Sequence, residues 1–231
     1  MTLCPVRHQR RKDARPHELL DAALSLFVEK GFAATRSEEV ARRAGVSKGT
    51  LYLYYPSKEE LSKAVVRQSL TPIIARSADI VGSFTGSTPE LLVRLMTTWW
   101  DNVGNTRASG IFKLIMAEAC NFPDLTQFYV NEVVIPTRQL LVRALQRGID
   151  RGEFRPLNVD EVAHALIAPV QYLVLHQHSI GACGFHDVDL APGSFMSTQI
   201  NLLVHGLMRP EAARQLDMPT LLAPLTDLAS T

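Results

Sequence analysis

Apolar side chains recur every three or four residues along almost the whole chain, which is the period of an amphipathic helix. No convincing run alternates apolar and polar positions as a half-buried strand would. The first clear apolar face is formed by Leu19, Leu20, Ala23, Leu26 and Phe27. The pattern therefore predicts an all-α fold that opens with a helix over about 16–30.

Glycines and serines punctuate the segment that follows. Gly31 is expected to end the first helix in a left-handed conformation, and Ser37 to cap a short second helix. Gly45 can supply the positive φ of a tight turn, after which Ser47 caps a third helix over about 48–54. Two short helices joined by such a turn form a helix-turn-helix, a motif common in DNA-binding proteins. The same spacing also fits an ordinary helical hairpin inside a bundle.

The rest of the chain continues the helical pattern. Ser57 caps a fourth helix over about 57–70, which Pro72 should end. About six helices follow, and breaks between them are expected near Gly82–Pro89, Gly104–Gly110, Phe122–Pro123, Gly152–Asn158 and Gly181–Gly193. The segment around Leu125–Arg151 is predicted to be one long helix that Pro136 bends.

Composition and charge narrow the class of protein. Hydrophobic residues make up 46% of the 231 residues and charged residues 20%, as in globular proteins, which excludes disordered and fibrous classes. The formal net charge of +1 hides an asymmetry: residues 1–67 carry 13 basic and 8 acidic groups, whereas residues 68–231 carry 11 and 15. A basic front and an acidic remainder favour a polyanionic partner for the N-terminal part, and nucleic acid over a membrane surface.

The cysteines and the longest apolar stretch bear on location. Cys4, Cys120 and Cys183 are widely separated and odd in number, which argues against a disulfide framework or a zinc knuckle and fits a reducing cytoplasm. The N-terminus does not have the pattern of a signal peptide, and the longest apolar stretch, Val162–Leu175, is too short to span a bilayer. We therefore expect a cytoplasmic protein with no membrane partner and no cofactor.

Residues 45–61, with the sequence GVSKGTLYLYYPSKEEL, closely resemble the DNA-binding signature of the tetracycline-repressor (TetR) family. The preceding helix and turn fit the same family through Ala22, Ala23, Phe27, Lys30, Gly31, Phe32 and Thr35. Phe122–Pro123 and residues 152–156 are similar to parts of the family's C-terminal domains. The resemblance implies an all-helical, homodimeric transcription factor that binds a palindromic double-stranded DNA operator, associates with the nucleoid when bound, and responds to a small-molecule effector.

The resemblance also implies how the chain is divided. It predicts a flexible basic arm (1–15), a helix-turn-helix DNA-binding domain (16–60), a larger helical effector-binding and dimerisation domain (61–210) and a C-terminal tail (211–231). Two late helices are predicted over about 159–180 and 194–208. The resemblance implies that they pair with the same helices of a second copy as a four-helix bundle.

The predicted recognition helix and its cap hold the residues expected to touch DNA. Lys48 and Thr50 lie in the first turn and would face base edges, where a lysine suits guanine O6 and N7. Ser47 would offer a hydroxyl to a phosphate, Gly49 would let the backbone come close, and Leu53 would contact a thymine methyl. The resemblance adds six candidates for contacts with the DNA backbone: Tyr52, Tyr54, Lys58, Thr35, Arg36 and Ser37.

A central effector cavity is implied by the resemblance, and the sequence offers candidates for its lining. These are Trp99, Trp100, Val103, Phe112, Met116, Cys120, Phe128, Tyr129, Tyr172 and His176. Because acids and bases are scarce among them, we expect an apolar or aromatic, largely uncharged ligand. A ligand that prefers misplaced recognition helices must weaken operator binding, so we expect a repressor that its effector releases from DNA.

Other classes of protein have less support. No metal site is expected, because His176 and His178 are two residues apart and lie on different helix faces. The chain has no GxSxG motif, no phosphate-cradling glycine loop and no recognisable nucleophile–base pair, so an enzyme is not expected. A DNA-binding architectural protein of the same fold, without a small effector, stays open as an alternative, because an apolar core and an apolar pocket look alike in a sequence.

Overall fold

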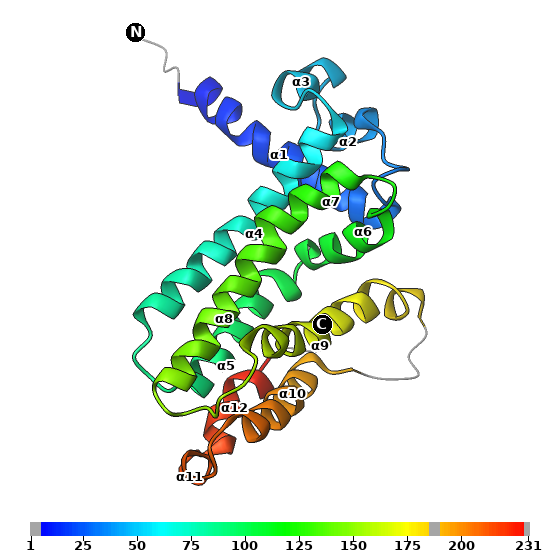
Figure 1. The fold of residues 1–231 in the computed structure, drawn as a ribbon. Coiled ribbons are helices and arrows are strands. Elements are labelled where there is room, and N and C mark those ends of the chain that lie inside the picture. The colour runs from blue at the N-terminus through cyan, green and yellow to red at the C-terminus, as the bar shows by residue number, and fades with distance from the viewer. Residues whose placement is uncertain (1–5, 185–189, 229–231) are drawn as a thin grey trace.

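The computed structural model describes residues 6–184 and 190–228, and this part of the chain is helical without a β-strand. The predicted all-α class is therefore confirmed. The first four helices are α1 (Val6–Lys30), α2 (Ser37–Arg43), α3 (Lys48–Tyr54) and α4 (Lys58–Ser83). We call residues 16–60 the head. Figure 1 shows α2 and α3 at one end of the molecule and α11 and α12 at the other.

The remaining elements form a larger helical body. They are α5 (Thr88–Trp99), the π-helical η1 (Trp100–Gly104), the 3₁₀ turn η2 (Arg107–Ser109), α6 (Gly110–Glu118), α7 (Pro123–Tyr129), the π-helical η3 (Val130–Val134), α8 (Ile135–Asp150), α9 (Val159–His178), the 3₁₀ turn η4 (Gly181–Cys183), α10 (Pro192–Leu207), α11 (Pro210–Ala213) and α12 (Met218–Thr226). In Figure 1 the long helices α4 and α8 lie side by side between the two ends. None of the described helices has the length and apolar character of a membrane span.

Glycines and serines of the head form turns and helix caps as predicted. Gly31 and Gly45 have φ angles of +85° and +67°, in the left-handed region that glycine enters without a steric penalty. Ser47 and Ser57 each accept, through the side-chain oxygen, the backbone N–H three residues later at 3.1 Å. These bonds satisfy otherwise unpaired donors in the first turns of α3 and α4. The helix-turn-helix therefore lies where the pattern predicted it.

The cap of α2 differs from the prediction. Arg36 is the N-cap residue, and Ser37 is the first helical residue and is buried. The carboxylate of Glu39 accepts the backbone N–H of Arg36 at 3.3 Å and the ammonium of Lys30 at 2.8 Å. The prediction that Ser37 caps this helix is therefore wrong, because a downstream carboxylate satisfies the N-cap backbone instead of a serine hydroxyl.

Helix α1 begins earlier than predicted. It starts at Val6 rather than near residue 16, so Pro16 lies inside it and residues 6–15 of the predicted flexible arm are helical. Residues 1–5 lie outside the described part of the chain. A proline removes one helical N–H and costs about 3 kcal/mol in a helix interior. Arginine, glutamine, lysine and alanine are good helix formers, which explains how the upstream segment can continue the helix.

Helix α4 also passes through a proline. Its predicted end at Pro72 is wrong, since the helix continues to Ser83. Pro72 is exposed, whereas Leu70 and Ile73 on either side of it are buried. Helix α4 packs against α1, α5, α7 and α8, so tertiary contacts hold the helix on both sides of the missing hydrogen bond.

The predicted helix over Leu125–Arg151 is divided. Helices α7 and α8 are joined by the π-helical segment Val130–Val134, and Pro136 lies in the first turn of α8. A proline leaves the carbonyl four residues earlier without its usual donor, and a π-turn is one way in which a helix accommodates such a local change.

The C-terminal segment is folded where a tail was expected. Residues 210–213 and 218–226 form α11 and α12, and Leu221 and Leu225 are buried. A Cβ placed on Gly193 of α10 would lie 2.4 Å from the carbonyl oxygen of Leu225, so glycine permits the close approach of α10 and α12. The prediction of a C-terminal tail over 211–231 is wrong for these residues, while α9 and α10 lie within two residues of their predicted bounds.

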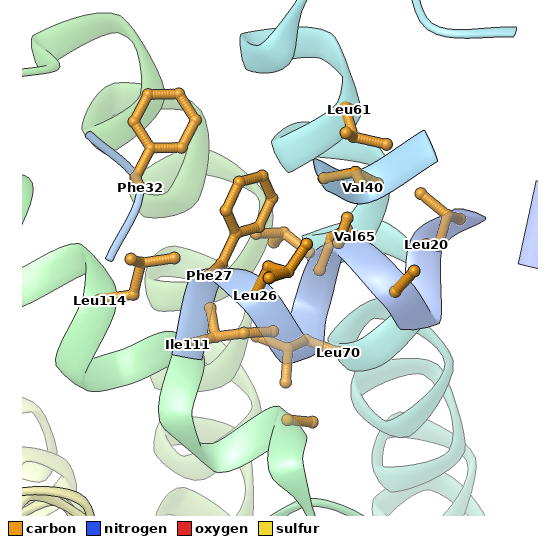
Figure 2. Packing of buried hydrophobic residues seen from close by; sticks show 14 of the residues in the cluster. Leu20, Leu26, Phe27, Phe32, Val40, Leu61, Val65, Leu70, Ile111 and Leu114 are labelled. Atoms are coloured by element: carbon orange, nitrogen blue, oxygen red, sulfur yellow. The ribbon is translucent and has the colours of Figure 1, made fainter. Parts of the chain in front are cut away.

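Two hydrophobic clusters organise the molecule. The first core joins the head and α4 to η1, η2, α6 and α7. Figure 2 shows Leu26 and Phe27 of α1 packed between α4 residues such as Val65 and the α6 residues Ile111 and Leu114. The second core joins α5 and η1 to α8, α9, α10 and α12. Apolar packing therefore runs across the predicted boundary at residue 60, and Trp99 packs against both cores.

Candidate nucleic-acid interface

Helix α3 is fixed to the rest of the head by one buried side chain and by the turn that precedes it. Leu51 is fully buried in the first core, as expected, and Val46 packs against that core from the turn. The backbone N–H of Val46 donates to the carbonyl of Ala41 at 2.9 Å. These contacts set the position of a helix of only seven residues, which would be marginal alone.

The other face of α3 is open to solvent. Leu53 is 82% exposed and Tyr52 is 40% exposed, and Lys48 and Gly49 in the first turn of the helix are exposed as well. Thr50 and Tyr54 are half-buried, and Tyr54 packs against the first core. A short helix anchored on one side and carrying exposed lysine, tyrosine and leucine on the other has the form of a helix that enters the major groove.

Lys48 has partners on the protein itself. Its ammonium forms an ion pair with the carboxylate of Glu38 on α2, and it lies 5.7 Å from the ring centroid of Tyr52. The hydrogen bond between the two charged groups raises the pKa of Lys48 and lowers the pKa of Glu38. Both groups are therefore charged at neutral pH. Sequence reasoning missed Glu38 as a partner of Lys48, because an acid in the first turn of α2 has an ordinary role beside the helix N-terminus.

The three candidates at the start of α2 lie in different environments. Thr35 is buried, and its hydroxyl donates to the carbonyls of Leu26 at 3.2 Å and Gly31 at 2.7 Å. Ser37 is also buried, while Arg36 is exposed. The surface that can meet DNA without rearrangement therefore includes Arg36 but not the side chains of Thr35 and Ser37.

Lys58 is engaged by the backbone of the α1–α2 turn. Its ammonium donates to the carbonyls of Phe32 at 2.8 Å, Thr35 at 3.2 Å and Ala33 at 3.3 Å. It also lies 4.4 Å from the ring centroid of Phe32. A lysine has three donor hydrogens, so these three carbonyls can use all of them. A phosphate contact by Lys58, which stays a prediction, would have to replace one of these bonds.

The end of α6 and the residue before α7 also contact this turn. The carboxylate of Glu118 accepts the backbone N–H of Ala33 at 3.1 Å, and the ring of Phe122 lies edge-on to Phe32 with centroids 4.5 Å apart. Glu118 is almost completely buried. Its sequence signal was weak, because a single acid at the end of an apolar helix does not reveal a partner 85 residues away.

The ten effector candidates divide by position. Val103 and Tyr129 are buried in the first core, Trp100 is buried in the second, and Trp99 lies between them. Phe112, Phe128 and His176 are half-buried, whereas Met116, Cys120 and Tyr172 are exposed. The indole Nε1 of Trp100 is buried and has no hydrogen-bond partner among the described residues. Burial raises the pKa of Tyr129 to about 12, so its hydroxyl stays neutral.

Comparisons with known proteins agree with this arrangement. Residues 19–65 match bacterial regulatory proteins of the tetR family, and residues 84–181 match the tetracyclin repressor-like C-terminal domain. The chain is 33% identical over 152 residues to the HTH-type transcriptional repressor KstR2 of Mycobacterium tuberculosis, a match that covers 65% of this chain and 74% of that protein.

Solved structures show the same fold. The ketosteroid transcriptional regulator KstR2 of Mycobacterium tuberculosis is 26% identical with a TM-score of 0.62, covering 84% of this chain and 95% of that one. A gamma-butyrolactone receptor (ArpA like protein) is 20% identical with a TM-score of 0.73, covering 94% and 98%. The family matches together span more than half of the chain. The chain therefore belongs to the TetR family of DNA-binding transcriptional regulators.

Proposed function

We propose that this regulator is a homodimeric repressor that binds a palindromic operator through α3 and releases it when a small, largely apolar or aromatic effector enters the helical body. The observation that carries the DNA-binding part is the exposed face of α3, with Lys48, Tyr52 and Leu53 outside and Leu51 buried beneath. Repression of transcription, rather than activation, is supported by the similarity to KstR2, whose name describes it as a transcriptional repressor.

The dimer is supported by exposed apolar side chains on the last two long helices. Leu202 of α10 is 71% exposed, and Tyr172 and Leu175 of α9 are 54% and 38% exposed. Large apolar side chains that are open in a single chain are typical of a surface that another chain covers. A twofold dimer would present two copies of α3, which must lie about 34–36 Å apart to enter successive major grooves on one side of the duplex.

The effector site is proposed between the two cores. Trp99 contacts both of them, and Trp100, Val103, Phe112 and Tyr129 lie in or against them. The unpartnered Nε1 of Trp100 offers one donor in otherwise apolar surroundings, which suits an apolar ligand with a single acceptor such as a carbonyl. A ligand of this kind is in keeping with the description of KstR2 as a ketosteroid transcriptional regulator. The exposed Met116, Cys120 and Tyr172 are left out of this site.

Release of DNA follows from linkage between the two sites. An effector that prefers a conformation with displaced recognition helices weakens operator binding by its difference in affinity, typically about 1–3 kcal/mol. Helix α4 contacts α1 in the head and α5, α7 and α8 in the body, so a shift of α4 would change the distance between the two α3 helices.

The DNA-binding proposal is tested with duplexes selected from random DNA by the full-length protein. Lys48→Ala should weaken binding to the selected duplex by about tenfold or more, because one good base contact is worth about 1–3 kcal/mol. The matched control is Lys63→Ala. Lys63 is also an ion-paired lysine, but it belongs to α4 and its ammonium lies over the ring of Phe128 in α7. Fluorescence anisotropy at fixed salt measures both variants.

Two results would count against the proposal. If the wild-type protein selects no sequence from random DNA at low salt, sequence-specific binding by α3 is wrong. If Lys48→Ala and Lys63→Ala weaken binding equally, the effect reflects net charge and not a contact from α3. The effector part is tested separately, by screening apolar carbonyl compounds for a rise in melting temperature and for release of the selected duplex.

A further inference from the structure

The ion pair between Glu38 and Lys48 links the two helices of the helix-turn-helix across their turn. Glu38 is the second residue of α2 and Lys48 is the first residue of α3. The two side chains are 53% and 54% exposed, so the pair lies on the solvent side of the head. The ring of Tyr52, 5.7 Å from the ammonium, provides a second neighbour on α3 itself. The ammonium is thus flanked by a carboxylate and an aromatic ring.

This pair differs in position from the other ion pairs around α2. Lys30 pairs with Glu39, and Arg43 pairs with Glu29, and in both cases α1 and α2 are joined without α3. Such exposed pairs contribute little to stability, because water and salt screen the two charges. The main effect of the Glu38–Lys48 pair is therefore on the position of the Lys48 ammonium and not on the stability of the fold.

A carboxylate beside Lys48 changes what that lysine can do on DNA. A lysine alone on a surface is a flexible point charge that binds any phosphate within reach, and phosphate contacts carry no sequence information. Glu38 uses one of the three ammonium hydrogens and leaves two, which suits the two acceptors O6 and N7 of a guanine. The negative charge of Glu38 also repels phosphates, which disfavours a move of the ammonium to the DNA backbone.

We propose that Glu38 is a specificity-determining residue of this regulator, which positions Lys48 toward a base edge and keeps its ammonium away from phosphates. Glu38 thereby lowers the affinity for duplexes of any sequence and raises the discrimination at one base pair in each half-site. The inference rests on the proposed function, since it requires that α3 enters the major groove.

The experiment uses the full-length protein and three kinds of duplex. These are an operator selected by the wild type from random DNA, variants of that operator with each base pair replaced in turn in both half-sites, and a random-sequence duplex of equal length. Glu38→Gln keeps the shape of the side chain and removes its charge. It should bind the random duplex several-fold more tightly and should lose about tenfold discrimination at one base pair of the half-site.

The salt dependence gives an independent readout. If the freed Lys48 takes up a phosphate in each protomer, the plot of log affinity against log salt for the random duplex should steepen by about 0.9 per new contact. The matched control is Glu60→Gln, which breaks an exposed glutamate–lysine pair with Lys63 on α4. This control should leave both the discrimination and the salt slope as in the wild type.

A double variant decides whether Glu38 acts through the lysine. Lys48→Ala should lose discrimination at the same base pair, and adding Glu38→Gln to it should cause no further loss. An unchanged specificity profile in Glu38→Gln would overturn the inference, and so would a further loss in the double variant, which would mean that Glu38 contacts a base itself. A wild type that prefers no sequence would instead overturn the proposed function, before any variant is compared.

Discussion

The lysines of this DNA-binding region illustrate how one residue type takes different roles a few residues apart. Lys48 pairs with a carboxylate on the exposed side of α2 and α3, Lys58 donates to three backbone carbonyls, and Lys63 lies against Phe128 on α7. In the sequence all three are basic residues near a recognition helix. Their roles separate only when the positions of their partners are known, because each partner lies on another element.

Lys58 is predicted to be important for stability. Lys58→Ala should lower the free energy of unfolding by about 2–3 kcal/mol, because hydrogen bonds to a charged group contribute about 1.5–3 kcal/mol and the carbonyls of the α1–α2 turn would lose their donor. Lys63→Ala, which breaks an exposed pair, should cost less than about 1 kcal/mol. Urea denaturation measures the free energy of unfolding of both variants, and the two values can be compared when the free energy depends on urea concentration with the same slope. Equal stabilities would mean that the Lys58 ammonium leaves the turn in solution and is free for a phosphate.

His178 is predicted to make stability depend on pH. Burial, and after it the charge of Lys113, lowers the pKa of His178, whose Nε2 lies 2.7 Å from the hydroxyl of Ser109. Between the ordinary value of about 6.5 and the lowered value, the unfolded chain binds a proton that the folded chain does not. Stability should therefore fall as the pH falls below about 7. Melting temperatures at pH 7.5 and 5.5 should differ more for the wild type than for His178→Gln, and equal differences would contradict this assignment.

At the scale of the elements, the sequence was informative wherever a single residue decides a local conformation. The turns at Gly31 and Gly45 and the cap at Ser47 depend on neighbouring atoms of the same segment, so their residue types predict them. The start of α1 was predicted wrongly because the residues before Pro16 are good helix formers, and the end of α4 was predicted wrongly because packing holds that helix on both sides of Pro72. Likewise, the C-terminal tail became α11 and α12 because Leu221 and Leu225 are buried by distant helices.

The α2–α3 turn gives a prediction at this scale. Gly45→Ala should lower the free energy of unfolding by about 1–2 kcal/mol, because φ of +67° is strained for alanine although no atom lies within 4 Å of the added Cβ. Gly82→Ala, near the end of α4, has equal space and no positive φ, so it should be neutral or stabilise by up to about 1 kcal/mol. Thermal or urea unfolding of both variants tests the pair. A harmless Gly45→Ala would mean that the turn can relax.

The site could be predicted from the sequence only where its residues depend on their own segment. The recognition helix was located to the residue, because its cap, its glycine turn and the family signature all lie within seventeen consecutive residues. Thr35 and Ser37 looked like surface hydroxyls, but both are buried beneath the turn that Lys58 and Glu118 hold. Contacts between segments far apart in the sequence are not visible in local residue types, and these contacts distinguish an exposed candidate from a buried one.

At the scale of the whole molecule, the proposed dimer would cover the exposed apolar residues of α9 and α10. Leu202→Glu should convert the proposed dimer to monomers, because a charge cannot be buried without a partner in an apolar interface. Val134→Glu on η3, where the side chain is 40% exposed and the element packs mainly against α4, α7 and α8, is the control and should leave the mass unchanged. Sedimentation equilibrium measures both. A Leu202→Glu protein that stays dimeric would place the interface elsewhere.

The first core has a practical consequence for anyone who wishes to build hybrid regulators from this chain. A fragment cut at residue 60 would leave Phe27 and Phe32 without Ile111, Leu114 and Phe122, which cover them in the intact protein. Such a fragment would carry a bare apolar surface and would tend to aggregate rather than read DNA. A transplanted head would therefore have to include α6 and α7, or the apolar surface that contacts these helices would have to be redesigned. Substituting a few exposed side chains of α3 would change the target DNA sequence with less disturbance of the first core.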